Sequence, residues 1–233
     1  ARRQRQMCIR DRNFNYDKAP KLEIAIGLES SNPVVLDKSV NKRLRWPHFV
    51  KVCKLARDNG AEVKAYILLK PPYLSEKESI DDAVKSAIDA APHVDKISIN
   101  PVNVQKNTVV EKLWFRNEWV APWLWSVVDV LKKCEDLPIR VYSDPTGGGT
   151  RRGAHNCHDC NKKILQALNN HRLGLGDLKG LHCNCKSRWD VLVQQSNLRR
   201  NGSEPHGYRS GFQAAGIFNG ANIATNNGRD KLA

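Results

Sequence analysis

Short apolar segments alternate along the chain with longer segments in which apolar residues recur every three or four positions. The short segments show two-residue alternation or a continuous apolar run, both typical of strands buried in a sheet. The longer segments show the period of a helix with one buried face. The predicted strands are 22–28, 62–69, 95–100 and 139–143. The predicted helices run from Pro47 to the Asn59-Gly60 stop, from Ser75 to Ala91, and from Glu118 to Cys134.

Local signals support the first two of these helices. Pro47 suits the first turn of a helix, where a missing N–H is harmless. Ser75 and Glu78 have the spacing of a capping box. Strands that alternate with helices predict an α/β fold with a parallel sheet, either open or part of a barrel. Functional loops in such folds follow the carboxyl ends of the strands.

Polar residues gather after the first and third predicted strands. Carboxylate, hydroxyl and amide groups there could bind the hydroxyls or ammonium of a ligand, and a nearby cation could pair with a carboxylate. Alternatively, the first of these segments caps the next helix, and the cation belongs to a solvated turn. Taken together, the residues predict a pocket for a polar, charged small molecule. They are Glu29, Ser30, Lys42, Asn100, Asn103 and Gln105.

Four of the seven cysteines form two close pairs, Cys157/Cys160 and Cys183/Cys185. Two short chelating loops joined by a segment long enough for a helix can present four thiolates to one tetrahedral metal ion. Zn²⁺ is the first expectation for such ligands, and an iron–sulfur cluster is the second. Four unpaired thiols or two disulfides are the alternatives that involve no metal.

Composition narrows the class of protein. The chain has 233 residues, 40% of them hydrophobic, and no apolar run long enough to predict a membrane span or a signal peptide. An odd number of cysteines, three of them scattered, fits a reducing cytoplasm better than a secreted disulfide framework. A formal charge of +14 suggests a polyanionic partner such as nucleic acid.

The two ends of the chain differ from the middle in composition. We expect residues 1–19 to be disordered or foreign to the protein, because the first twelve are charged and have no periodicity. We expect residues 198–233 to form a disordered basic tail, since they are rich in Asn, Gly and Ser. Between them we expect an α/β part at 20–150 and a Cys-rich metal-binding module at 151–197.

The order of several strings resembles the second half of a radical S-adenosylmethionine (SAM) barrel. More narrowly, the chain resembles the family of radical-SAM subunits of archaeosine synthase over roughly residues 20–195. The segments that carry the resemblance are IGLESSN (26–32), SVNK (39–42), VKAYILLKPP (63–72), NPVNVQ (100–105) and HNCHDC with HCNC (155–160, 182–185).

This resemblance implies a lyase that cleaves a lysine adduct on a 7-deazaguanine base of archaeal tRNA to give archaeosine. It implies SAM and a [4Fe-4S] cluster as cofactors, and a lysine-transferring synthase subunit as partner. Glu29 and Ser30 would lie by SAM, Lys42 near its carboxylate, and Asn100, Asn103 and Gln105 along the cavity. The four paired cysteines would form an accessory metal module.

The sequence departs from the family in one respect. A radical SAM protein binds its cluster through a C-x3-C-x2-C triplet, and the 233 residues contain none. We therefore expect a fragment that holds half of the barrel and is inactive alone.

Two other functions remain open. One is a zinc-binding nucleic-acid-binding module on an α/β scaffold. The other is a different SAM- or phosphate-binding enzyme, with the glycine run 146–149 around the phosphate.

Overall fold

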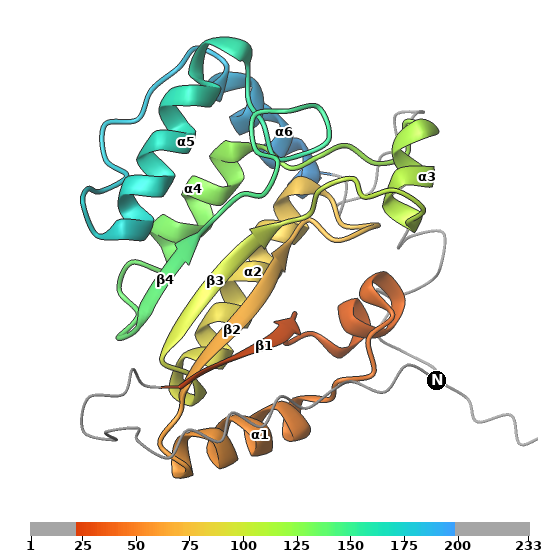
Figure 1. Ribbon diagram of the computed structural model, residues 1–233. Coiled ribbons are helices and arrows are strands. Elements are labelled where there is room, and N and C mark those ends of the chain that lie inside the picture. The colour runs from red at the N-terminus through yellow and green to blue at the C-terminus, as the bar shows by residue number, and fades with distance from the viewer. Residues whose placement is uncertain (1–21, 199–233) are drawn as a thin grey trace, which may run out of the picture.

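The computed structural model describes residues 22–198, with side chains described as far as residue 195 (Figure 1). The predicted first segment, 1–19, lies outside the described residues. So does the predicted tail, 198–233, apart from its first residue.

Four parallel strands form one sheet in the order β1-β2-β3-β4 (Figure 1). The parallel α/β fold predicted from the sequence is therefore confirmed. A sheet whose strands follow one another in chain order has the arrangement of a barrel segment, whereas a doubly wound sheet reverses direction at a switch point. The strands are β1 (Glu23–Glu29), β2 (Glu62–Leu69), β3 (Lys96–Pro101) and β4 (Arg140–Ser143).

Helices follow each strand. The helices α1, α2, α4 and α5 contact β2 or β4, and α6 packs on α2. The longer helices are α1 (Trp46–Asp58), α2 (Glu76–Ala90), α4 (Leu124–Lys133), α5 (His158–Leu173) and α6 (Lys186–Leu198). The shorter ones are the π-helix η2 (Val35–Val40), the 3₁₀ turn η3 (Ala91–His93) and α3 (Val109–Phe115).

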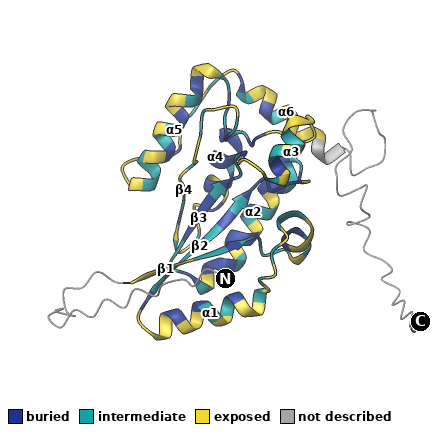
Figure 2. Ribbon diagram, turned by 45° about the vertical axis from the view of Figure 1, so that its right-hand side comes forward, coloured by how far each residue is buried: buried dark blue, intermediate teal, exposed yellow. Residues whose placement is uncertain are grey.

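One face of the sheet is covered and the other is open. Along β2, Val63, Ala65, Ile67 and Leu69 are fully buried, and the residues between them are partly exposed. Successive strand residues point to opposite faces of the sheet, so this alternation of burial shows that the helices cover one face. Figure 2 shows the same division, with the strands and inner helix faces buried and the outer faces exposed.

The predicted capping box is confirmed. The Glu78 amide donates to Ser75 Oγ at 3.3 Å, and the Ser75 amide donates to Glu78 Oε2 at 2.9 Å. The prediction of one helix over Glu118–Cys134 is wrong at its start, because α4 begins only at Leu124. Pro122 lies in the extended segment before α4, where the indole of Trp119 is buried.

The Cys-rich segment belongs to the same hydrophobic core as the sheet. Cys160, Ile164, Leu168 and Trp189 all join the core cluster that contains the sheet residues. The predicted boundary at residue 150 therefore separates two compositions that share one core. Within residues 22–198, no helix is long and apolar enough to cross a bilayer.

Candidate metal centre and adjoining pocket

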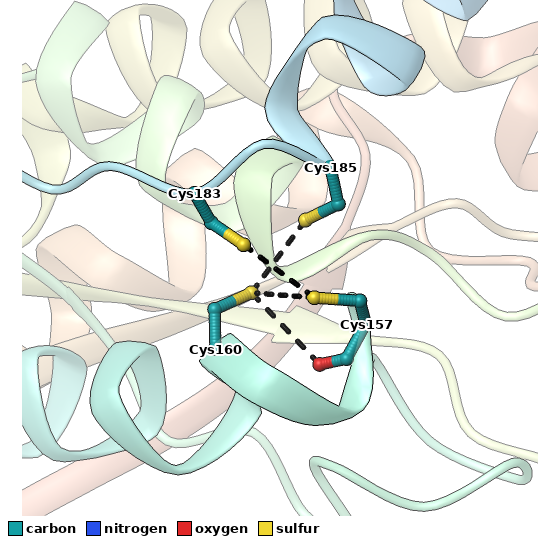
Figure 3. Close-up of side chains that lie close together, drawn as sticks. All are labelled: Cys157, Cys160, Cys183 and Cys185. Carbon is teal, nitrogen blue, oxygen red and sulfur yellow. Dashed lines mark hydrogen bonds between the residues drawn. The ribbon is translucent and has the colours of Figure 1, made fainter.

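The four paired cysteines converge on one point (Figure 3). Cys157 precedes α5, Cys160 lies in its first turn, and Cys183 and Cys185 come from the loop before α6. Their Sγ atoms all lie within 4.8 Å of one another. Three Sγ–Sγ pairs, 157–160, 157–183 and 160–185, are 3.6, 3.5 and 3.6 Å apart. Thus the sequence prediction that these thiols lie together is confirmed.

The spacing of the sulfurs fits one tetrahedral ion. Zn–S bonds of about 2.3 Å place the corners of a tetrahedron about 3.8 Å apart, close to the three distances observed. A [4Fe-4S] cluster takes one thiolate on each of its irons, so its four sulfurs stand outside the cluster and away from one another. Sulfurs this close therefore suit a single ion and do not suit a four-iron cluster.

Surrounding groups shift the pKa values of the thiols of this centre in opposite directions. The N-terminal end of α5 carries partial positive charge, which stabilises thiolates beside it. Trp125 Nε1–H donates to Cys185 Sγ at 3.3 Å, a contact that orients a metal ligand from outside. Burial opposes ionisation of Cys157, but hydrogen bonds with Cys183 and Cys160 lower its pKa to about 7. Burial and the neighbouring thiols raise the pKa of Cys160. Bound cationic metal would stabilise all four thiolates together.

A second site lies on the open face of the sheet, towards the carboxyl ends of β2, β3 and β4. It is a cavity of about 760 Å³, within the range of small-molecule pockets. Asn100, Asn103 and Gln105, three of the predicted ligand-binding residues, line it. Gln105 Nε2 donates to Asn103 Oδ1 at 2.7 Å, and Asn103 Nδ2 donates to the Thr146 carbonyl at 3.1 Å.

The pocket also contains residues that the sequence analysis did not select. Five of them, on β2, β3 and β4, occupy alternate strand positions, the signal that could have identified them as sharing the open face. They include Tyr66, Ser98, Tyr142 and Arg172, the last of which comes from α5.

Glu29 and Lys42 form an ion pair at the end of β1, outside this pocket. Lys42 Nζ lies 2.9 Å from Glu29 Oε1 and also donates to the Gly27 carbonyl. Glu29 has a φ of 68°, and the pairing of β1 with β2 shifts register between Gly27 and Glu29. A side chain at Gly27 would collide with both members of the pair. The sheet therefore brings two predicted residues together where β1 ends.

Ser30 does not face either site. It is fully buried, and its hydroxyl donates to Asp82 Oδ1 at 2.9 Å, which anchors the loop after β1 to α2. The glycine run 146–149 also differs from a phosphate cradle. The Gly148 and Gly149 amides donate to the Pro145 and Ala154 carbonyls, so these amides are not available to a phosphate.

Comparison with known proteins identifies relatives of this chain. No family model matches the chain. The chain is 38% identical over 183 residues to archaeosine synthase subunit beta of Methanosarcina acetivorans and 41% identical over 181 residues to that of Thermococcus kodakarensis. Each match covers 76% of this chain, and 52% and 56% of the relatives, so the chain spans about half the length of the curated relatives it matches. Among solved structures, Methanocaldococcus infernus Elp3 with an N-terminal deletion matches 66% of this chain and 37% of that chain at 17% identity, with a TM-score of 0.47.

Proposed function

The chain is homologous to part of archaeosine synthase subunit beta, and on that premise we propose that it takes part in making archaeosine in tRNA. In this proposal it supplies part of a radical SAM enzyme that cleaves the lysine adduct on a 7-deazaguanine base. The lysine-transferring synthase subunit is its partner. The sequence identity of 38–41% is the observation that carries the proposal.

The size and polar lining of the pocket suit a small polar ligand such as SAM or the modified base. Its amides can hydrogen-bond to hydroxyls, carbonyls and ring nitrogens without requiring a charge on the ligand. The Glu29–Lys42 pair lies at the carboxyl end of β1, and such ends carry ligands in parallel α/β folds. In the proposal, Glu29 and Lys42 bind the amino-acid part of SAM, and Asn100 and Asn103 hydrogen-bond to the ligand within the cavity.

The four-cysteine centre has a structural role in this proposal. Cys157, Cys160, Cys183 and Cys185 would hold one Zn²⁺ and fix α5 and α6 against the core. The cluster that reduces SAM does not fit these residues, and the triplet that would bind it is absent from the 233 residues. No chemical step is therefore assigned to the metal centre.

Binding of SAM by the full chain tests the proposal. Isothermal titration with SAM should show saturable binding, and Asn100→Ala should weaken it about tenfold, since the loss of its hydrogen bonds to the ligand removes about 1–3 kcal/mol. Lys51→Gln, an exposed change on α1, serves as the matched control. Absence of SAM binding by a folded, zinc-loaded chain would contradict the assignment of the pocket and of the Glu29–Lys42 pair to SAM.

The distribution of charge favours a second candidate, a zinc-binding nucleic-acid-binding module on an α/β scaffold. Residues 151–197 contain eight Lys or Arg and three Asp or Glu, whereas residues 22–150 contain 18 and 17. The positive charge is therefore concentrated around the cysteines. This candidate predicts tRNA binding without SAM binding, so the same titration separates the two.

A further inference from the structure

The helix α3 carries an exposed aromatic ring beside the polar pocket. Phe115 is 67% exposed, and its ring centroid lies 5.1 Å from that of Trp114. Thr108 and Val110, at the start of α3, line the pocket. Phe115 is thus the last residue of a short helix whose first turn lines the pocket.

Trp114, which contacts the Phe115 ring, is held in place by Arg152. Arg152 lies over the Trp114 ring, with its guanidinium carbon 5.2 Å from the ring centroid. The same guanidinium pairs with Glu111 and donates from Nε to the Val104 carbonyl at 3.1 Å. These contacts fix α3 and leave Phe115 as the exposed member of the aromatic pair.

The segments that form and flank α3 are basic. Four exposed cations lie on α3, on the segments that flank it, or next to Arg152 in the chain. Among the described residues of these segments, the one exposed carboxylate is that of Glu118. None of the four forms an ion pair with a carboxylate of residues 22–198, so their charge is available to a polyanion. They are Lys106, Lys112, Arg116 and Arg151.

We infer that Phe115 and these four cations form a stacking platform for an unpaired nucleotide of RNA at the entrance to the pocket. Aromatic rings stack on bases of any sequence, and flanking cations contact the phosphates. An enzyme acting on a base must take it out of its stack, and a ring at the rim can hold a neighbouring base while this happens. A protein partner would bury the ring as well, but it would not require four unpaired cations. This inference rests on the proposed function, because it assumes that RNA is the substrate.

Binding of an unstructured RNA of about 12 nucleotides by the full chain tests the platform. We expect Phe115→Ala to weaken binding about tenfold, because stacking contributes about 1–3 kcal/mol per base. Phe115→Tyr, which keeps the ring, should bind like the original chain. Leu55→Ala removes an equally exposed apolar side chain from α1, away from α3 in both views (Figures 1 and 2), and should have no effect.

Salt dependence tests the cations separately. Replacing Lys112 and Arg116 by Gln should lower the slope of log affinity against log salt by about 0.7 for each phosphate that the variant no longer neutralises. The platform is overturned if the chain binds no RNA at low salt, if Phe115→Ala binds as well as the original, or if Leu55→Ala weakens binding equally. A chain that binds SAM while Phe115→Ala binds RNA normally would refute the platform and leave the proposed function intact.

Discussion

Asp82 carries a carboxylate whose burial should reduce the stability of this fold at neutral pH. Its Oδ1 accepts the Ser30 hydroxyl, and its Oδ2 is buried without a hydrogen-bond partner among the described residues. Burial raises the pKa of Asp82 from 3.8 to about 6; the negative charge of Asp89 adds to the effect, and the Ser30 hydrogen bond opposes it.

The sign and size of the effect follow from this pKa. A folded-state pKa above the unfolded value means that the folded chain binds the proton more tightly, so stability falls as pH rises from about 4 to about 6. A difference of about two units corresponds to about 3 kcal/mol of unfolding free energy, fully lost above about pH 7. Asp82→Asn removes the ionisation, so we expect it to stabilise the fold by about 1–3 kcal/mol at about pH 8 and by nearly nothing at about pH 4.

Urea unfolding monitored by circular dichroism at several pH values measures this difference. Asp81→Asn is the matched control, since Asp81 is exposed on the same helix and, among the described residues, pairs with Lys77 alone, in an i,i+4 arrangement worth less than about 0.5 kcal/mol. The reasoning is refuted if the stability difference between Asp82→Asn and the original chain stays constant between about pH 4 and pH 8. It is equally refuted if the variant is less stable at about pH 8.

Three further outcomes are expected. Cys183→Ser should lower bound zinc from about one equivalent per chain, measured by elemental analysis, and lower the melting temperature; retention of full zinc would contradict the four-ligand centre. Glu76→Gln should lower the unfolding free energy measured in urea by about 3 kcal/mol, because it leaves the buried Lys70 ammonium without its carboxylate partner. Lys77→Gln, which breaks an exposed ion pair on the same helix, should lower it by less than about 1 kcal/mol. Gly27→Ala should cost less than about 1 kcal/mol, because the atoms that the new methyl meets are the ends of the flexible Glu29 and Lys42 side chains, which can shift; a clearly lower urea midpoint would show that the ion pair is held rigidly.

The sequence predicted the elements whose local signals were strong. The four strands match the predicted segments within one residue at each end, because alternation and apolar runs reflect burial in a sheet directly. Among the described residues, η2, α3 and α6 were not predicted, and α5 was expected only as a segment long enough for a helix. The helix α6 has no clear apolar stripe; its Trp189 is buried and donates to Ser126 Oγ at 2.7 Å. Contacts between distant segments stabilise such a helix, and a local pattern does not show them.

The four cysteines were predicted as one site because their spacing alone limits the chelating loops they can form. Their convergence on one point was decided by the fold, which places the start of α5 against the loop before α6. The tertiary structure also separated the predicted ligand-binding residues. It placed Asn100 and Asn103 in one cavity, paired Glu29 with Lys42 at the end of β1, and buried Ser30 against α2.

The sequence by itself thus determined which segments form strands, that they lie parallel, and which residue types are available for chemistry. These properties depend on periodicity and spacing between residues close together in the chain. The open face of the sheet, the single-ion geometry of the thiols and the exposed ring of Phe115 were decided by the tertiary structure. They depend on side chains that are far apart in sequence, and only packing of the whole core fixes the distances between them.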